Sequence, residues 1–166
     1  MQGSANLNIM LKAARKAARS LVKDFREVEN LQVSSKGPGD FVSKADLSAE
    51  EILREDLFGA RPTYGWLAEE EDGEIEGKDP TRRWIVDPLD GTREYSEVPR
   101  TDWAVHVALV TDNRPVAGAV ALPGLGLVLS TADVPILAPT GTTPARMIVS
   151  RSRPPADRAR TSRRPR

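Results

Sequence analysis

The sequence changes from apolar to acidic within the stretch Trp84-Ile85-Val86-Asp87-Pro88-Leu89-Asp90-Gly91-Thr92. An aromatic residue followed by two β-branched residues is typical of a buried strand, and Pro88, which lacks an N–H, is expected to end that strand's ladder. Asp87 and Asp90 would then lie across a tight turn, where two carboxylates can share one side of a small cavity and hold a hard cation such as Mg²⁺. The alternative is an ordinary strand exit, because Asp-Pro and Asp-Gly are common turn dipeptides.

The composition limits the kind of protein this chain can be. Its 166 residues, 39% of them hydrophobic, suit one domain with a real core. There is no cysteine, so a bound metal must use oxygen ligands or the single histidine, His106. No stretch approaches the roughly 20 apolar residues that span a bilayer, and the N-terminus has no secretory pattern. We therefore expect a soluble, cytoplasmic protein that does not bind membranes.

The zero net charge hides an asymmetry between two parts of the chain. Residues 151–166 hold seven Arg and one Asp, which leaves 17 basic and 23 acidic residues in positions 1–150. We expect residues 1–150 to form the folded domain and residues 151–166, which contain no large apolar side chain, to form a disordered tail. The acidic body argues against a nucleic-acid surface, and the Arg-rich tail offers at most non-specific contact with polyanions.

Two helices are expected in the N-terminal part. Apolar residues recur at three- and four-residue steps over residues 6–27, which predicts an amphipathic helix packed on the core. Residues 32–40 are a loop by composition, and this loop carries Lys36. A second helix is expected from residue 43 or 44 to residue 58, so that Asp46 would lie near the positive N-terminal end of a helix.

The other apolar runs predict short strands. Their positions are residues 63–68, 103–110, 116–122, 125–131 and 147–149. The first run leads directly into Glu69 and Glu70, and the next three are separated by turn residues, which predicts an antiparallel meander. His106 has no second His or Cys nearby, so a structural or surface role is expected for it. Neither a dinucleotide fingerprint nor a Walker motif is present.

Four acidic or basic features follow one another at loop edges and strand ends: Lys36, Asp46, Glu69-Glu70 and Asp87-Pro88-Leu89-Asp90-Gly91-Thr92. In this order they resemble the signature of the inositol monophosphatase superfamily, the Mg²⁺-dependent, lithium-sensitive phosphatases. The resemblance implies an α+β fold with two N-terminal helices packed on a mostly antiparallel sheet, the N-terminal half of that family's layered architecture. It also implies a small phosphorylated substrate, Mg²⁺ as the cofactor and inhibition by Li⁺.

The resemblance assigns metal-binding roles to four residues. Glu69 and Asp87, together with the Leu89 carbonyl, would bind a first metal ion. Asp87 and Asp90 would bind a second. Clustered cations are needed because a phosphate monoester is negatively charged and repels a hydroxide nucleophile.

The resemblance also assigns residues to the attacking water and to the phosphate. Glu69, Asp46 and Thr92 would orient and deprotonate the water. The N–H groups of Gly91 and Thr92 would bind the phosphate in the way that a helix N-terminus binds an anion. Two further residues complete the expected site, with Glu70 supporting it from behind and Lys36 lying beside it.

The resemblance is not uniform along the chain. Residues 6–92 look like a bacterial inositol monophosphatase, whereas residues 93–155 look like the CysQ-type 3'(2'),5'-bisphosphate nucleotidase branch. A chimera joined at the shared motif and natural drift within one branch both account for this change. The family's further domain contains a Trp-Asp motif that completes the second metal site, and this chain has only the reversed pair Asp102-Trp103. A frameshift, a truncation or a designed stop would produce the Arg-rich ending.

Two functions follow from the resemblance. The first is Mg²⁺-dependent hydrolysis of inositol monophosphate or of a 3'(2'),5'-bisphosphate nucleotide, with residues 1–150 as a metal-binding phosphatase domain that is incomplete relative to the family. The second is a truncated, inactive fragment that acts only as a binding or assembly module. An incomplete layered fold would leave a sheet edge and apolar surface uncovered, so we expect the chain to associate with itself.

Overall fold

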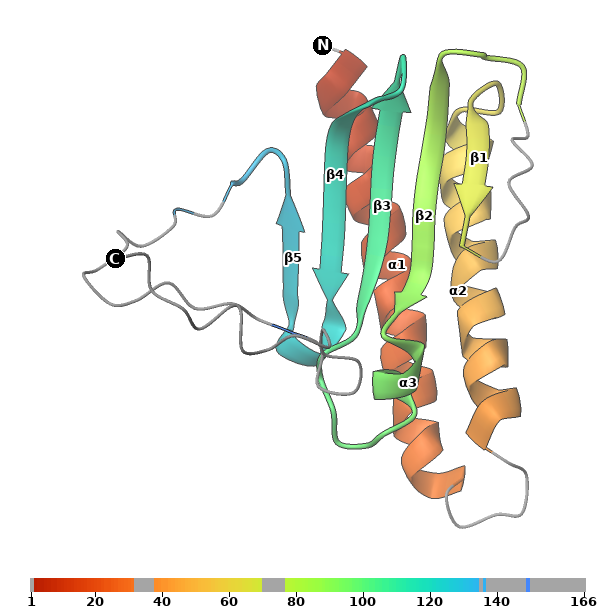
Figure 1. Ribbon diagram of the computed structural model, residues 1–166, viewed down its shortest axis with the longest axis vertical. Coiled ribbons are helices and arrows are strands. Elements are labelled where there is room, and N and C mark those ends of the chain that lie inside the picture. The colour runs from red at the N-terminus through yellow and green to blue at the C-terminus, as the bar shows by residue number, and fades with distance from the viewer. Residues whose placement is uncertain (1, 32–37, 70–76, 135, 137–148, 150–166) are drawn as a thin grey trace, which may run out of the picture. The chain divides into compact units, whose positions relative to one another are not determined.

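The chain forms two long helices that lie against one face of a single sheet (Figure 1). The computed structural model describes residues 2–31, 38–69, 77–134, 136 and 149, and their side chains except at residues 2, 3, 26–31 and 38–43. In chain order the elements are α1 (Gln2–Leu31), α2 (Pro38–Ala60), β1 (Gly65–Ala68), β2 (Arg82–Asp90), α3 (Thr92–Tyr95), β3 (Ala104–Thr111), β4 (Arg114–Leu122), the 3₁₀ turn η1 (Pro123–Leu125) and β5 (Leu127–Ser130). The chain divides into two units, residues 1–135 and 136–166, and all these elements belong to the first. The predicted α+β fold is confirmed.

Both helices extend beyond their predicted limits. The inward face of α1 is a row of buried alanines flanked by Met10 and Leu21, which allows the helix to pack closely. α2 begins at Pro38, so the expected loop up to residue 40 and the expected helix start at residue 43 or 44 are wrong. Proline suits the first position of a helix because the N–H that it lacks would have no intrahelical partner there. The earlier start leaves Asp46 inside α2, away from the helix end that was expected to stabilise its charge.

The sheet has the strand order β1-β2-β3-β4-β5. β1 and β2 are parallel, and each later strand pairs antiparallel with the one before it, which confirms the predicted meander. β2 continues to Asp90, so the prediction that Pro88 ends the strand is wrong. The pairing register of β2 with β3 shifts between Asp87 and Asp90, and this bulge accommodates a residue that has no N–H to donate.

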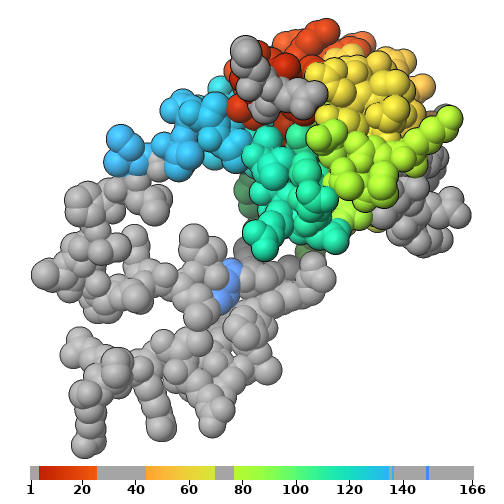
Figure 2. All heavy atoms as spheres, turned by 90° about the horizontal axis from the view of Figure 1, so that it is seen from above, coloured from red at the N-terminus to blue at the C-terminus, as the bar shows by residue number. Residues whose placement is uncertain are grey.

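The core lies between the helices and the sheet. Trp66 and Trp84 are fully buried and lie opposite each other in the β1–β2 register, and alternate residues of β3 and β4 continue the same face. Figure 2 shows the atoms of α1 (red) on one side of the atoms of β2 and β3 (green to teal). On the opposite face, Val116, Leu127 and Leu129 are 56%, 51% and 39% exposed.

Aromatic side chains attach the turn after β2 to α1. Tyr95, the last residue of α3, is buried and donates a hydrogen bond of 2.8 Å from its hydroxyl to the carbonyl oxygen of Leu21. Its ring meets Trp103 edge-on with centroids 4.9 Å apart, and Phe25 packs against both rings. The segment that follows the acidic motif is therefore held in place by the helix layer.

Some predicted elements are not covered by the described residues. The strand expected at residues 147–149 lies outside them apart from Val149, and the Arg-rich segment 151–166 lies outside them entirely. Among the helices that are described, none is both long enough and apolar enough to cross a membrane.

Candidate metal centre

The parallel pairing of β1 with β2 brings two of the predicted acids to the same end of the sheet. Ala68 lies opposite Val86, so Glu69 and Asp87 are the next residues on the two neighbouring chains. Glu69 is exposed and Asp87 is partly buried. The two carboxylates are close enough for the charge of Glu69 to raise the pKa of Asp87.

The bulge in β2 places Asp87 and Asp90 on the same face of the sheet. In a regular strand, residues three apart point to opposite faces. Here Asp87 lies opposite His106 and Asp90 lies opposite Ala104. Between these two pairs, β2 therefore contains one more residue than β3. Pro88 and Leu89 are both buried, and the carboxylate of Asp90 returns to the face of Asp87.

The pKa of Asp87 reflects the closeness of the other negative charges. Its pKa is raised from 3.8 to about 6, first by burial and then by the charges of Glu69 and Asp90. His106 and a hydrogen bond of 3.2 Å donated by the Leu89 N–H to Asp87 Oδ1 act in the opposite direction. Carboxylates that repel one another at a partly buried position are stabilised when a cation lies between them.

The turn after the strand is a tight, glycine-dependent structure. Gly91 has φ +82° and precedes α3, and its carbonyl oxygen accepts a hydrogen bond of 2.8 Å from the Tyr95 N–H. The Thr92 hydroxyl donates a hydrogen bond of 3.0 Å to the carbonyl oxygen of Leu89. A Cβ atom at position 91 would lie 3.0 Å from the carbonyl oxygen of Asp102, so the chain before β3 forms the wall of this turn.

His106 also lies beside the carboxylates of Asp87 and Asp90, whereas only a structural or surface role was expected for it from the sequence. Its Nε2 atom lies 3.1 Å from Asp90 Oδ2, and it stands opposite Asp87 in the ladder. The signal that could have found it is the strand pairing, because directly opposed residues share a face. Sequence alternation alone could not identify its partner.

The remaining predicted residues are placed less completely. Asp46 lies on α2, and it is not among the groups that shift the pKa of Asp87. Lys36 and Glu70 lie outside the described residues. The structure therefore brings together Glu69, Asp87 and Asp90 and places the Leu89 carbonyl, Gly91 and Thr92 beside them, as shown by the contacts above.

The donor chemistry of this end of the sheet fits Mg²⁺. The carboxylates of Glu69, Asp87 and Asp90 and the Leu89 carbonyl are all hard oxygen donors. Within the described part of the chain, no set of three or more acidic or histidine side chains is arranged to hold an ion by itself. Mg²⁺ is commonly bound by one or two carboxylates with water and substrate phosphate in the other positions, and this donor set is consistent with that pattern.

Fold and site together define a helix-and-sheet module that gathers carboxylates at the end of a parallel strand pair. The model of the inositol monophosphatase family matches residues 5–136, and the chain belongs to that family.

Named relatives agree with this assignment. The chain is 51% identical over 132 residues to an inositol-1-monophosphatase of Mesorhizobium japonicum, covering 79% of this chain and 48% of that protein. It is 43% identical over 89 residues to the Nus factor SuhB of Vibrio cholerae, covering 54% of this chain and 33% of that protein. A crystal structure of the extragenic suppressor protein SuhB from Bartonella henselae superposes with a TM-score of 0.66 at 46% identity, covering 76% of this chain and 48% of that one. The chain thus spans about half the length of the Mesorhizobium inositol-1-monophosphatase and of the Bartonella SuhB, and about a third of the Vibrio SuhB.

The alignment with the Mesorhizobium protein tests the expected change after Thr92 from inositol monophosphatase-like to bisphosphate nucleotidase-like sequence. An alignment of 132 residues within a chain of 166 must run through Thr92 and well beyond it. Similarity to a protein named inositol-1-monophosphatase therefore extends over both sides of the expected junction. The likeness of residues 93–155 to bisphosphate nucleotidases stays a prediction.

Proposed function

We propose that this chain carries the metal- and phosphate-binding residues of an Mg²⁺-dependent phosphomonoesterase that acts on inositol monophosphate. The observation that carries the proposal is the convergence of Glu69, Asp87 and Asp90 at one end of the sheet, through the parallel pairing of β1 with β2 and the bulge in β2. The raised pKa of Asp87 agrees with it. A carboxylate cluster that costs stability in the free protein is explained if a cation is its normal partner. The names of the relatives support the substrate class.

Each residue has a defined task in this proposal. Glu69, Asp87 and the Leu89 carbonyl hold a first ion, and Asp87 with Asp90 holds a second. Bound Mg²⁺ supplies neutralisation of the ester's charge and a lowered pKa for a coordinated water. The Thr92 hydroxyl donates its own hydrogen to Leu89, so its oxygen faces the water as an acceptor.

Proton transfer and phosphate binding fall to neighbouring groups. The Thr92 oxygen accepts a hydrogen bond from the water and orients it, and a carboxylate oxygen of Glu69 takes the water's other proton, with Asp46 as a further acceptor. The N–H groups of Gly91 and Thr92 precede the first intrahelical hydrogen bond of α3, which the Tyr95 N–H makes, and they bind the phosphate oxygens. We assign Glu70 to the support of Glu69 and Lys36 to the approach of the substrate.

Phosphate release from inositol 1-phosphate tests the proposal. We expect release with Mg²⁺ and none with a chelator, and Li⁺ is expected to inhibit it. Asp87→Asn is expected to lower the rate at least about a hundredfold, since even the outer partners of metal ligands are worth about 10–100-fold. The matched control is Asp112→Asn in the β3–β4 turn, an exposed position with φ +50° that asparagine tolerates. Equal rates for wild type and Asp87→Asn would refute the assignment, and faster release from 3'-phosphoadenosine 5'-phosphate would favour the nucleotidase branch.

A second candidate function is a binding or assembly module without catalysis. It is favoured by two partly exposed apolar side chains, Leu127 and Leu129, on β5, the last strand in the sheet order. We expect the chain to run as a dimer or larger oligomer in size-exclusion chromatography with light scattering, and Leu129→Lys is expected to shift it toward monomer. A wild-type chain that is monomeric at high concentration would contradict this candidate.

A further inference from the structure

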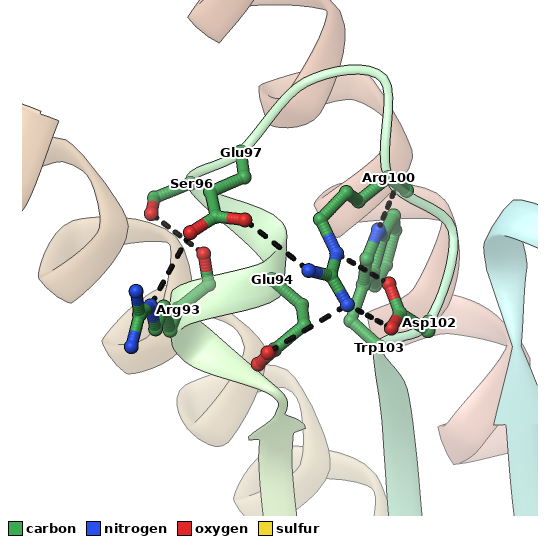
Figure 3. Close-up of polar contacts among 7 residues, drawn as sticks. All are labelled: Arg93, Glu94, Ser96, Glu97, Arg100, Asp102 and Trp103. Carbon is green, nitrogen blue, oxygen red and sulfur yellow. Dashed lines mark hydrogen bonds and ion pairs between the residues drawn. The ribbon is translucent and has the colours of Figure 1, made fainter. Parts of the chain in front are cut away.

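A partly buried guanidinium lies in the segment that follows the turn after the acidic motif. Arg100 belongs to the segment between α3 and β3, and its side chain is only 19% exposed. It contacts three carboxylates, those of Glu94, Glu97 and Asp102 (Figure 3). An arginine surrounded in this way is fixed in position, because its Nε, Nη1 and Nη2 atoms are all engaged by carboxylates.

The individual contacts join two parts of the chain. Arg100 Nε donates to Asp102 Oδ1 at 2.7 Å and Nη2 donates to Asp102 Oδ2, which makes a bidentate pair with the residue that precedes Trp103. Nη1 donates to Glu97 Oε2 at 3.2 Å, and Nη2 lies 3.7 Å from Glu94 Oε1 on α3. One side chain therefore ties α3 and its exit to the start of β3.

The tied segment is the wall of the Gly91 turn. The Asp102 carbonyl and the Trp103 backbone lie so close to Gly91 that an added Cβ would be 3.0 and 3.3 Å from them. The indole Nε1 of Trp103 in turn donates a hydrogen bond of 3.2 Å to the Arg100 carbonyl oxygen. A shift of residues 100–103 would therefore move the surface against which Gly91, the residue before Thr92, is packed.

We propose that Arg100 is a positioning residue for the phosphate-binding turn, holding the Gly91 and Thr92 N–H groups in the orientation that accepts a phosphate. The inference rests on the proposed function, in which this turn binds the phosphate. Arg100 touches neither phosphate nor metal in this arrangement. Its effect is transmitted through Glu94 on one side and through Asp102 and Trp103 on the other.

The charge-conserving variant Arg100→Lys separates this role from a simple need for a positive charge. Lysine keeps the charge and loses the fork that engages Asp102 through two bonds. In 10 mM Mg²⁺ we expect its dissociation constant for inorganic phosphate, measured by ³¹P NMR titration, to rise about tenfold. Its dissociation constant for Mg²⁺, measured by calorimetry, is expected to change less than about twofold, since Glu69, Asp87 and Asp90 lie on the strands. General loss of structure would weaken both.

The matched control is Arg93→Lys. Arg93 also bonds Glu97, at 3.2 Å, but it is 66% exposed, and the contacts recorded for it do not reach Asp102. We expect its phosphate affinity to stay within about twofold of wild type. If Arg100→Lys does not fold, Asp102→Asn, which weakens the same pair from the exposed side, is expected to show the same split between phosphate and Mg²⁺.

The outcomes distinguish the two proposals. If wild type and Arg100→Lys bind phosphate equally well, the positioning role is overturned and the proposed function is not. Equal losses in Arg100→Lys and Arg93→Lys overturn it as well, because they indicate that losing a guanidinium anywhere in this segment has the same effect. Wild type that binds no phosphate with Mg²⁺ present overturns the proposed function, and the positioning role falls with it.

Discussion

Asp87→Asn is expected to raise the melting temperature of the metal-free protein at pH 7.5, although it removes the residue that the proposed activity needs most. The pKa of Asp87 is raised from 3.8 to about 6 in the folded chain, so the folded state holds a proton more tightly than the unfolded state does. Stability is therefore lost as the pH rises from about 4 to 6, and the loss is complete above that window. Asparagine has the same shape and no charge, and its oxygen can still accept the Leu89 N–H.

The size of this gain is modest because Asp87 is partly open to solvent. After discounting for that screening, we expect about 1 kcal/mol at pH 7.5, or roughly 2–4 °C in melting temperature, and no gain below pH 4. Added Mg²⁺ is expected to stabilise wild type and to leave Asp87→Asn nearly unchanged. The control is Asp79→Asn, because the Thr81 hydroxyl and the Thr81 N–H lower the pKa of Asp79, so that its neutralisation cannot stabilise the protein at pH 7.5. A metal-free Asp87→Asn protein that melts below wild type at pH 7.5 would contradict the prediction.

Gly91→Ala is expected to destabilise the protein by about 2 kcal/mol and to abolish phosphate binding. Gly91 has φ +82°, a conformation that costs an L-residue with a side chain about 1–2 kcal/mol. The new methyl group would also approach the Asp102 carbonyl and the Trp103 Cα and Cβ atoms to 3.0–3.3 Å. Thermal melting gives the stability change, and phosphate titration in Mg²⁺ gives the change in binding.

Gly126→Ala separates the two contributions. Gly126 has φ +66°, close to the conformation of Gly91, but a Cβ there would meet no atom within 4 Å. Gly126→Ala therefore adds the free-energy cost of a positive φ without a steric contact. We expect it to lower the free energy of unfolding by about 1 kcal/mol and to leave phosphate binding intact. If both alanine variants melted alike and both bound phosphate, the close packing of Gly91 against residues 102–103 would not be needed for phosphate binding, and the prediction would be wrong.

The sequence predicted the fold because its apolar runs and turn residues agree with one another. The three runs after Asp102 became β3, β4 and β5 in the expected antiparallel order, since short separations between strands leave little choice of partner. The start of α2 was missed because Pro38 and Gly39 are usually loop residues. Their effect depends on position within the helix, and composition does not reveal position.

The sequence was sufficient to predict which residues belong to the candidate site but not how they are arranged in space. The order of Asp46, the Glu69-Glu70 pair and the Asp87–Thr92 motif was sufficient to indicate the family, which the match over residues 5–136 confirmed. The pairing of β2 with β3 is set by non-local contacts, so neither the bulge nor the approach of His106 to Asp90 could be deduced from spacing. Arg100 was missed for the same reason, because its partners are defined by how the loop folds back on α3.

The bulge in β2 makes the site depend on the length of the chain as well as on its residue types. Asp87 and Asp90 share a face only because β2 has one residue more than β3 between them. Deleting Pro88 or Leu89 would remove the bulge and leave the two acids two residues apart, which in a regular strand is still one face. Inserting one residue between them would instead require a larger bulge or, with the bulge unchanged, a shift in register that turns one of the two carboxylates to the opposite face. Substitutions at these two positions change packing, whereas a one-codon insertion changes which acids can face the same ion.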